Sequence, residues 1–391
     1  MTAFIAPGAT LGVMGGGQLG RMFVHAAQQM GYFTVVLDAD PASPAGLVAH
    51  HHIKADYLDE QGLAQLMQRS AAITTEFENV PAAALMTLGA HRPMSPGAEA
   101  VAVCQDRADE KRHFARCDVA CAPHAVIDNA AQLEAVPGHL LPGILKTTRL
   151  GYDGKGQVRV ATRADLAAAW AALGGVSTVL EQQLQLAFEV SVIVARSADG
   201  QLVHFPLQQN LHRDGILAVT QVPAPDLTLA LQQRAIDAAE RVAESLGYVG
   251  VLCVEFFVLQ DGSLVANEMA PRPHNSGHYT VDACDLSQFD LQVRTMTGAP
   301  LVAPRLHSPA VMLNLLGDLW FAPASSGQST SAREPDWARV LALPGVHLHL
   351  YGKATPRRAR KMGHLTVTAA SAAEARSVAL QVATVLGLSA F

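Results

Sequence analysis

The chain is poor in cysteine, in aromatic residues and in charge. Only 5% of its 391 residues are aromatic and 16% are charged, while half are hydrophobic. A chain of this length and composition can bury a large core and divides into two or three domains. Its five cysteines are odd in number and show no CxxC spacing, which argues against a disulfide framework or a cysteine-based zinc site. We therefore expect reduced thiols and a cytoplasmic protein.

A strong positive charge is also missing. The net charge of −6 and the pI near 6.2 argue against non-specific nucleic-acid binding. No uninterrupted apolar run reaches membrane-spanning length, and no basic region followed by an apolar stretch stands at the N-terminus. The sequence thus predicts neither nucleic acid nor membrane as a partner, and any anionic ligand must be held by local charge.

A predicted β-hairpin carries the strongest chemical signal. Two apolar runs flank Asp261-Gly262, a dipeptide typical of a two-residue hairpin loop. Counting outward from that loop pairs Leu259 with Leu264 and places Glu255 opposite Glu268. Directly opposed carboxylates repel unless a cation lies between them, and such oxygen ligands suit Mg²⁺ with a nucleotide. The pattern predicts a Mg²⁺–nucleotide site on this hairpin.

The alternative for this hairpin is a solvated pair of strands whose glutamates face water. Strand alternation places Glu255 and Glu268 on one face with Phe257, Leu264 and Ala266. Charges among apolar side chains require a partner when they are buried. The apolar company therefore favours the metal site.

The N-terminal segment matches a dinucleotide-binding fingerprint. A short apolar strand at residues 11–14 precedes the glycine-rich residues 15–20, and a helix then runs to about Met30. A second strand ends at Asp38, about twenty residues after the glycines. This pattern is typical of an NAD-dependent dehydrogenase, although any βαβ unit with a close backbone approach to phosphate needs the same glycines.

Two further features of the N-terminal region have competing interpretations. Glu76 follows a third predicted strand, so it lies at the sheet edge where ligands of open α/β sheets bind, or it is a helix-start carboxylate. Residues 50–52 are three consecutive histidines. Consecutive side chains rarely converge on one ion, so we expect an exposed loop there and no metal site.

The middle of the chain contains a second glycine-rich loop. Residues 97–117 are expected to form a helix that links two domains, and a later strand ends in Lys146. Residues 151–157 then hold three glycines beside a lysine, a composition that can close over phosphate oxygens. A glycine-rich turn without a ligand is the alternative.

Other segments add groups suited to a nucleotide and an anion. Residues 181–184 leave a strand and can offer backbone groups to an adenine, while Glu189 can accept from ribose hydroxyls. His212 is expected just after another strand, and residues 270–278 form a polar loop suited to a small anion. The basic residues 357–364 can hold a phosphate monoester or form a solvated loop.

Together these segments resemble the ATP-grasp enzymes. More narrowly, the chain resembles the 5-(carboxyamino)imidazole ribonucleotide synthase family, through motifs at residues 15–22, 76–80, 105–107, 151–157, 267–278 and 351–353. The similarity runs from about Leu11 to the C-terminus. It implies an α/β and α+β fold with a Rossmann-like pre-ATP-grasp domain (1–110), an ATP-grasp domain (111–299, with a mobile lid at about 122–184) and a small β-rich C-terminal domain (300–391).

The resemblance also implies a reaction. It is the ATP- and Mg²⁺-dependent carboxylation of 5-aminoimidazole ribonucleotide by bicarbonate through carboxyphosphate, as a step of purine biosynthesis. The family similarity implies a homodimer as well. Three alternatives stay open: a related ligase such as a formate-dependent glycinamide ribonucleotide transformylase, a non-catalytic nucleotide-binding module, and the dehydrogenase.

The resemblance assigns roles to individual residues. Arg272, His274 and Asn275 would orient carboxyphosphate, with Asp153 as a further catalytic residue, and Glu255 and Glu268 would bind Mg²⁺. The predicted ATP contacts are Arg107, Lys146, Gly151, Tyr152, Asp153, Gly154, Lys155, Gly156, Gln157, Glu181, Gln182, Gln183, Leu184, Glu189, His212, Asn267 and Glu268. The predicted ribonucleotide contacts are Gln18, Leu19, Glu76, Asp153, Arg272, Lys353, Arg360 and Lys361.

One position departs from the wider superfamily. Many ATP-grasp sites have an asparagine two residues after the second metal glutamate, where this chain has Ala270. Asn267 precedes the glutamate instead, and strict strand alternation would turn its side chain away from Glu268. Only an irregular strand would bring Asn267 to the nucleotide.

Overall fold

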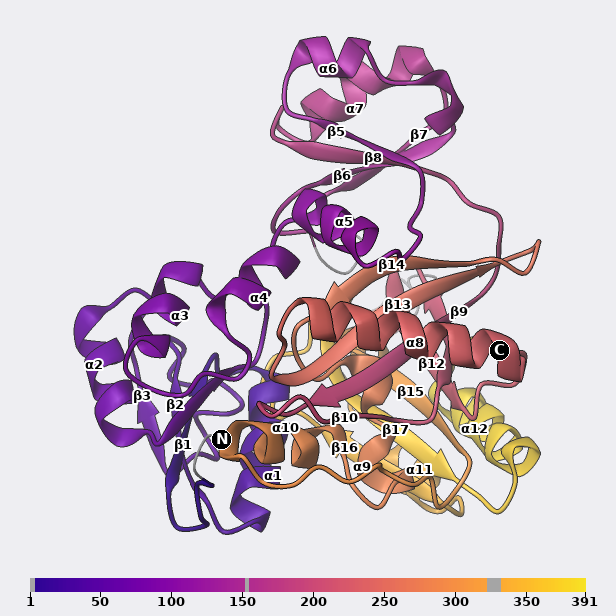
Figure 1. Cartoon of the computed structure of the whole chain (residues 1–391). Coiled ribbons are helices and arrows are strands. Elements are labelled where there is room, and N and C mark those ends of the chain that lie inside the picture. Colours follow the sequence, from indigo (N-terminus) through magenta and orange to yellow (C-terminus); the bar gives the residue numbers. More distant parts are fainter. Residues whose placement is uncertain (1–3, 152–154, 322–331) are drawn as a thin grey trace.

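The computed structural model describes residues 4–151, 155–321 and 332–391. Within these ranges the strands form three sheets, one in an N-terminal lobe, one in a small lobe that stands apart at the top of Figure 1, and one large sheet below it. No helix in the described ranges has both the length and the apolar character needed to cross a membrane. All five cysteines are free, as expected.

The N-terminal sheet is parallel, with the strand order β3-β2-β1-β4. Helix α1 covers one face, where it packs with the later helix α10 (Gln288–Thr297), and helices α2 and α3 pack on the other. Burial on both faces explains the near-continuous apolar strands. The elements are β1 (Thr10–Met14), α1 (Gln18–Gln29), β2 (Phe33–Leu37), β3 (His51–Ile53), α2 (Glu60–Arg69), β4 (Ala72–Thr75) and α3 (Ala82–Gly89).

The predicted exposed loop at residues 50–52 is only partly right, because His50 and His51 are exposed but His51 and His52 begin strand β3. His52 Nε2 lies 3.0 Å from the Asp38 carbonyl oxygen, and His50 Nδ1 accepts from the Thr34 amide at 3.2 Å. The rings of His50 and His52 therefore contact different partners, one just before the edge strand β3 and one within it.

The predicted single helix over residues 97–117 is also wrong. It is two helices, α4 (Ala98–Cys104) and α5 (Arg107–Arg116). Asp106 causes the break, because it adopts an extended conformation and its carboxylate accepts from the amides of Ala108 (3.0 Å) and Asp109 (3.4 Å). An aspartate in this geometry starts a new helix.

The small lobe is a sheet with the order β5-β8-β6-β7 and its own hydrophobic core. Short helices α6 and α7 lie over the sheet in Figure 1. Its elements are β5 (His124–Ile127), α6 (Ala130–Glu134), η1 (Gly138–Leu140), β6 (Gly143–Thr147), β7 (Gln157–Val160), η2 (Arg163–Asp165), α7 (Leu166–Ala172) and β8 (Thr178–Gln182).

The large sheet runs in the order β14-β13-β9-β11-β12-β15-β17-β16, with β10 beside β9. The pairing of β12 with β15 makes it continuous from the centre of the chain to the C-terminal part. Its strands are β9 (Leu186–Arg196), β10 (Leu202–His204), β11 (Gln208–Arg213), β12 (Ile216–Val222), β13 (Gly250–Leu259), β14 (Leu264–Ala270), β15 (Ala310–Leu316), β16 (Val346–Leu350) and β17 (Lys361–Thr368).

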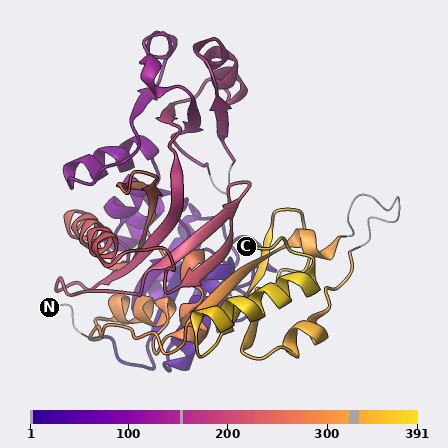
Figure 2. The same cartoon turned by 90° about the vertical axis from the view of Figure 1, so that its right-hand side faces the viewer.

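Helices cover both faces of the large sheet. Helix α8 (Leu229–Ser245) packs on one face through Ala239 and Val242, and α10 (Gln288–Thr297) packs on the other through Leu291. Helix α12 (Ala372–Leu386) lies along the C-terminal strands, as Figure 2 shows. The remaining short elements are η3 (Asn275–Gly277), α9 (Thr280–Ala283), η4 (Gly317–Trp320) and α11 (Trp337–Leu341).

Two local predictions in this sheet need correction. His212 lies inside β11, where we expected it to follow a strand. Lys361 and His364 lie in β17, and His364 is fully buried, so the basic segment is not simply a solvated loop. The cross-strand pairing of β17 with β15 and β16 explains this burial.

Candidate active site

The hairpin of β13 and β14 brings Glu255 directly opposite Glu268, as predicted. Near the turn, however, the predicted register is wrong by one residue, because Val258 is the partner of Leu264. A β-bulge at Asn267 absorbs this difference and restores the predicted pairing at the glutamates. Because of this bulge, β14 is irregular at Asn267, so strict strand alternation does not determine the direction of the Asn267 side chain.

The bulge also changes which side chains share a face. Leu264 and Ala266 belong to the core beneath α8, together with Phe256. The predicted common face of these apolar side chains with Glu255 is therefore wrong. Glu255 and Glu268 lie on the opposite face of the hairpin, because Phe256 is the strand neighbour of Glu255 and points the other way.

Glu255 is a buried carboxylate with cationic neighbours. It is 7% exposed, and its Oε1 lies 3.0 Å from His274 Nε2. Burial alone would raise the pKa of Glu255, but the charges of His274 and His212 hold that pKa at about 2. The alternative in which both glutamates face water is therefore wrong for Glu255. The Glu268 side chain, by contrast, is 42% exposed.

A third carboxylate, Glu189, lies beside this pair. Glu189 Oε2 is 2.7 Å from His212 Nδ1, and ligand atoms of Glu189, His212 and Glu255 all lie within 4.8 Å of one another. Burial would lower the pKa of His212, but the two glutamates raise it to about 9. Carboxylate oxygens are the donors that Mg²⁺ prefers, so this arrangement fits the predicted metal.

Arginine and lysine side chains pair with Glu268 and with a further carboxylate, Glu181. Arg107 on α5 pairs with Glu268 at 3.1 Å and donates to the Gly151 carbonyl at 3.3 Å. Lys146 on β6 pairs with Glu181 on β8 at 2.8 Å. A second lysine, Lys111, lies 3.1 Å from the same Glu181 carboxylate. No role was predicted for Lys111, because a lysine on a charged helix is typical of a solvated face.

The loop after β14 positions the three residues predicted to orient carboxyphosphate. Arg272 pairs with Glu78. Burial alone would raise the pKa of Glu78, but the charge of Arg272 holds that pKa at about 2. Asn275 is 5% exposed, and neither polar atom of its side-chain amide has a hydrogen-bond partner among the described residues. An unpaired buried amide is costly, so Asn275 fits a residue that hydrogen-bonds a ligand.

The glycine-rich loop before α1 is filled by carboxylates from this chain. Glu76 accepts from the amides of Gly17 (2.6 Å) and Gly20 (2.9 Å), and Asp38 accepts from Gly16 (2.7 Å). Glu76 directly follows β4, as predicted, and its carboxylate also caps the start of α1, which was the alternative, so both placements hold. These amides are the donors that a dinucleotide pyrophosphate would need, so the geometry disfavours the dehydrogenase.

Several predicted ribonucleotide residues gather beside this loop. Lys353 Nζ donates to Gln18 Oε1 at 2.8 Å and to the Lys361 carbonyl oxygen at 2.6 Å. The Leu19 side chain packs in the N-terminal core. Arg360 is half-buried and donates to the Thr355 carbonyl oxygen at 2.8 Å.

The segment predicted to meet adenine is partly occupied. The amides of Gln182 and Gln183 donate to the carbonyl oxygens of Pro123 and Pro142, both at 2.9 Å. These two amides therefore already have partners within the chain. The predicted contacts Tyr152, Asp153 and Gly154 lie outside the described residues. Lys155 and Gly156 lead into β7, whose first residue is Gln157.

A second group with metal-binding side chains does not have metal geometry. Asp282 Oδ2 lies 2.9 Å from His349 Nε2, and the Tyr351 hydroxyl lies 2.9 Å from His364 Nδ1. The rings of His349 and His364 are stacked, with 11° between their planes. Two stacked rings cannot both direct in-plane lone pairs at one ion, so this group is a hydrogen-bonded aromatic cluster.

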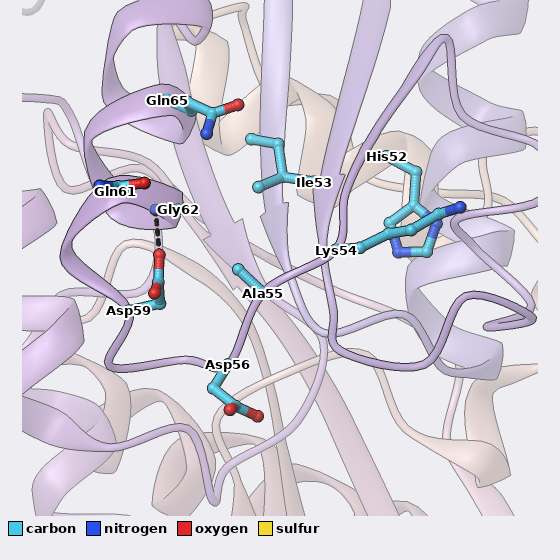
Figure 3. Close-up of a pocket in the computed structure, with 9 residues that line it drawn as sticks. All are labelled: His52, Ile53, Lys54, Ala55, Asp56, Asp59, Gln61, Gly62 and Gln65. Carbon is cyan, nitrogen blue, oxygen red and sulfur yellow. Dashed lines mark hydrogen bonds between the residues drawn. The ribbon is translucent and has the colours of Figure 1, made fainter.

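Figure 3 shows an open pocket of about 540 Å³ at a different place, between the end of β3 and α2. Charged side chains of both signs line it, including Lys54, Asp56 and Asp59. The Asp59 carboxylate already accepts from the Gly62 amide at 2.6 Å, so it caps α2. No predicted site residue lines this pocket.

Comparisons with known proteins agree with the fold. A ribonucleotide synthetase preATP-grasp domain model matches residues 8–105, and an ATP-grasp domain model matches residues 112–289. A phosphoribosylaminoimidazole carboxylase C-terminal domain model matches residues 310–378. The N5-carboxyaminoimidazole ribonucleotide synthase of Brucella melitensis is 43% identical over 366 residues, which are 93% of this chain and 97% of that protein. The chain belongs to the N5-carboxyaminoimidazole ribonucleotide synthase family.

Solved structures of this family have the same fold. An N5-carboxyaminoimidazole ribonucleotide synthetase in complex with ADP superposes with a TM-score of 0.90, at 39% identity over 98% of each chain. The Aspergillus clavatus synthase in complex with ADP and 5-aminoimidazole ribonucleotide gives 0.86, at 30% identity over 97% of this chain and 98% of that one. The predicted order of pre-ATP-grasp, ATP-grasp and C-terminal domains is confirmed.

Proposed function

We propose that this chain catalyses the ATP-dependent carboxylation of 5-aminoimidazole ribonucleotide by bicarbonate, in purine biosynthesis. The observation that carries the proposal is the placement of Glu255 opposite Glu268, with Glu189 and cationic side chains around them. The family of ATP-grasp ligases to which the chain belongs supports it. The products are ADP, phosphate and the N-carboxylated ribonucleotide.

The two chemical steps need positioning and charge neutralisation more than acid–base catalysis. In the first step a bicarbonate oxygen attacks the γ-phosphorus of ATP, the bond to the β-phosphate oxygen breaks, and ADP leaves. In the second step the substrate amine attacks the carbon of carboxyphosphate, phosphate leaves, and the nitrogen loses a proton. The developing charge is anionic in both steps, so the side chains that face it must be cations and hydrogen-bond donors.

We assign the ATP side of this reaction to the hairpin and the small lobe. Glu255 and Glu268, with Glu189 adjacent, would hold Mg²⁺, which neutralises phosphate charge when it is bound. Arg107 and Lys146 supply further positive charge. The small lobe, which carries Lys146 and Glu181, is proposed to act as the lid over ATP.

We assign the acceptor side to the loop after β14 and the N-terminal lobe. Arg272, held by Glu78, and the unpaired amide of Asn275 are proposed to orient carboxyphosphate. His274, held against Glu255, stays beside them. The proposed ribonucleotide residues are Gln18, Leu19, Glu76, Asp153, Lys353, Arg360 and Lys361.

We also propose the domain limits 1–110, 111–299 and 300–391, a homodimer and a cytoplasmic location. The free thiols support the location, because cytoplasmic cysteines stay reduced. The family resemblance is the support for the dimer, and sedimentation of the purified chain would test it.

An ADP-release assay with several substrate pairs tests the proposed function. ADP should form with 5-aminoimidazole ribonucleotide and bicarbonate together, and labelled bicarbonate should enter the ribonucleotide. Formate with glycinamide ribonucleotide should give no ADP above background. ADP release with that second pair alone would favour the formate-dependent ligase, and nucleotide binding without ADP release would favour a non-catalytic module.

A further inference from the structure

Two consecutive side chains of α5 hold the backbone of β14 on both sides of Glu268. The Glu110 carboxylate accepts from the Met269 amide at 2.6 Å, and Lys111 Nζ donates to the Asn267 carbonyl oxygen at 2.9 Å. Glu110 is 2% exposed and Lys111 is 1% exposed. Hydrogen bonds in such a dry environment are costly to lose, because the abandoned partner has no water.

These bonds lie where β14 lacks its regular ladder. The bulge at Asn267 interrupts the pairing with β13 immediately before Glu268. A bulge leaves its extra residue unpaired and bends the strand. The strand alone therefore does not fix the direction of the Glu268 side chain, and side chains from another element must do so.

We propose that Glu110 and Lys111 are positioning residues that fix the bulged backbone, so that Glu268 presents its carboxylate to the metal–nucleotide complex. The proposal rests on the function proposed above for this site. Neither residue touches the reacting atoms in it. Arg107, one helical turn earlier on the same face of α5, reaches the Glu268 carboxylate itself at 3.1 Å.

Lys111 also connects Glu268 to the small lobe. The Glu181 carboxylate lies between Lys111 (3.1 Å) and Lys146 (2.8 Å). The chain of contacts thus runs from the β14 backbone through Lys111 and Glu181 to Lys146, which we propose faces the ATP phosphates. A change at Lys111 should therefore affect the metal glutamate and the lid together, whereas a change at Glu110 should affect the metal glutamate alone.

Binding of Mn²⁺, used in place of Mg²⁺, in the presence of ADP tests this role without turnover. Free Mn²⁺ is followed by electron paramagnetic resonance with three proteins: wild type, Glu110→Met and Glu110→Gln. Glu110→Met removes the acceptor and should weaken Mn²⁺ binding by roughly 10-fold, the order seen when residues behind metal ligands are lost. Glu110→Gln keeps an oxygen acceptor for the Met269 amide and should recover most of the affinity.

Lys111→Met gives an independent arm. It should weaken Mn²⁺ binding and also raise the KM for ATP, whereas Glu110→Met should leave the ADP affinity measured without metal unchanged. The matched control is Phe114→Leu on the core side of α5. This control should lower the melting temperature without changing the Mn²⁺ affinity.

The proposal is overturned if Glu110→Met binds Mn²⁺ as tightly as wild type, or if Glu110→Gln is as weak as Glu110→Met. It is also overturned if Phe114→Leu shows the same loss, or if neither methionine variant folds, since the pair would then be purely structural. If the wild-type chain binds Mn²⁺–ADP but forms no ADP from ATP when the proposed substrates are supplied, that result refutes the proposed function alone. The Mn²⁺ comparison still decides the positioning role in that case.

Discussion

Buried carboxylates at this site differ in protonation because their nearest neighbours differ. Burial raises the pKa of every buried acid, yet the values for Glu78, Glu181 and Glu255 stay at about 2, because each carboxylate contacts a cationic side chain. For Glu110, burial outweighs the nearby charge of Lys111, and its pKa rises to about 7. At neutral pH, Glu78, Glu181 and Glu255 are therefore ionised, whereas Glu110 is present in both its protonated and its ionised form.

Replacing Glu268 by alanine tests the proposed metal role. The side chain is partly exposed and pairs with Arg107, so its loss should leave the fold intact, with a melting temperature within a few degrees of wild type. Turnover should fall by at least about 100-fold, because an electrostatic group at the transferring phosphate is lost. Steady-state ADP release at saturating ATP, titrated with Mg²⁺, measures this effect.

The control for this variant is Glu244→Ala on the exposed side of α8. It removes one carboxylate from the same protein without touching the site, so its Mg²⁺ titration should match wild type. Near-normal rates for Glu268→Ala would contradict the metal assignment.

The titration of Glu110 predicts a pH-dependent gain from Glu110→Gln. Because the folded-state pKa of about 7 is above the ordinary 4.5, the stabilising contribution of Glu110 is full below pH 4.5 and is lost as the pH rises through 7. Glutamine does not titrate. The free energy of unfolding of Glu110→Gln, relative to that of wild type, should therefore increase by about 1–3 kcal/mol between pH 5 and pH 8. Urea unfolding in Mg²⁺-free buffer at both pH values measures the difference, and a constant difference would contradict it.

At the scale of elements, the N-terminus of α1 is built around the carboxylate that follows β4. Gly17 has no Cβ, and a Cβ there would overlap the Glu76 carboxylate. Gly17→Ala should therefore displace Glu76 from the helix N-terminus and lower the free energy of unfolding by about 1–2 kcal/mol. It should also raise the KM for the ribonucleotide at least several-fold while the KM for ATP stays unchanged, and steady-state kinetics with each substrate varied would show this.

Gly97→Ala is the matched control for this change. Gly97 starts α4 in an ordinary extended conformation, and no atom lies within 4 Å of a Cβ placed there. Both KM values should be those of wild type. Equal changes in the two KM values for Gly17→Ala would contradict a ribonucleotide site at this loop.

The order of helices and strands was largely predictable from the sequence, because it depends on local apolar patterns. The pairing of Glu255 with Glu268 was predicted correctly, but the turn dipeptide alone does not set it, because the bulge at Asn267 offsets a one-residue error in the predicted register near the turn. The bulge at Asn267 and the break at Asp106 were not predictable. The bulge depends on contacts with distant segments, and the break depends on the way the Asp106 side chain caps α5. The roles of Glu110 and Lys111 were hidden because distant segments bury them.

At the scale of the whole molecule, the two proposed substrates meet different lobes of one body. Helix α10 joins the N-terminal lobe to the large sheet, and its Gln292 donates to Thr74 of β4 at 3.0 Å. The bond from Lys353 to Gln18 ties the C-terminal part to the same lobe. The small lobe has a separate core and meets the rest through Glu181 and its neighbours.

This arrangement predicts different protection patterns for the two ligands in hydrogen–deuterium exchange. Mg²⁺–ADP should slow exchange in β6, β8 and the β13–β14 hairpin, because it would bind between the small lobe and the large sheet and hold the lid closed. The ribonucleotide should slow exchange at the start of α1 and in the segment from Tyr351 to Lys361, where Gln18 and Lys353 meet. If Mg²⁺–ADP instead slows exchange at the start of α1 and leaves β6 and β8 unchanged, the nucleotide binds at the N-terminal loop. That result would contradict the proposed ATP site and favour the dehydrogenase alternative.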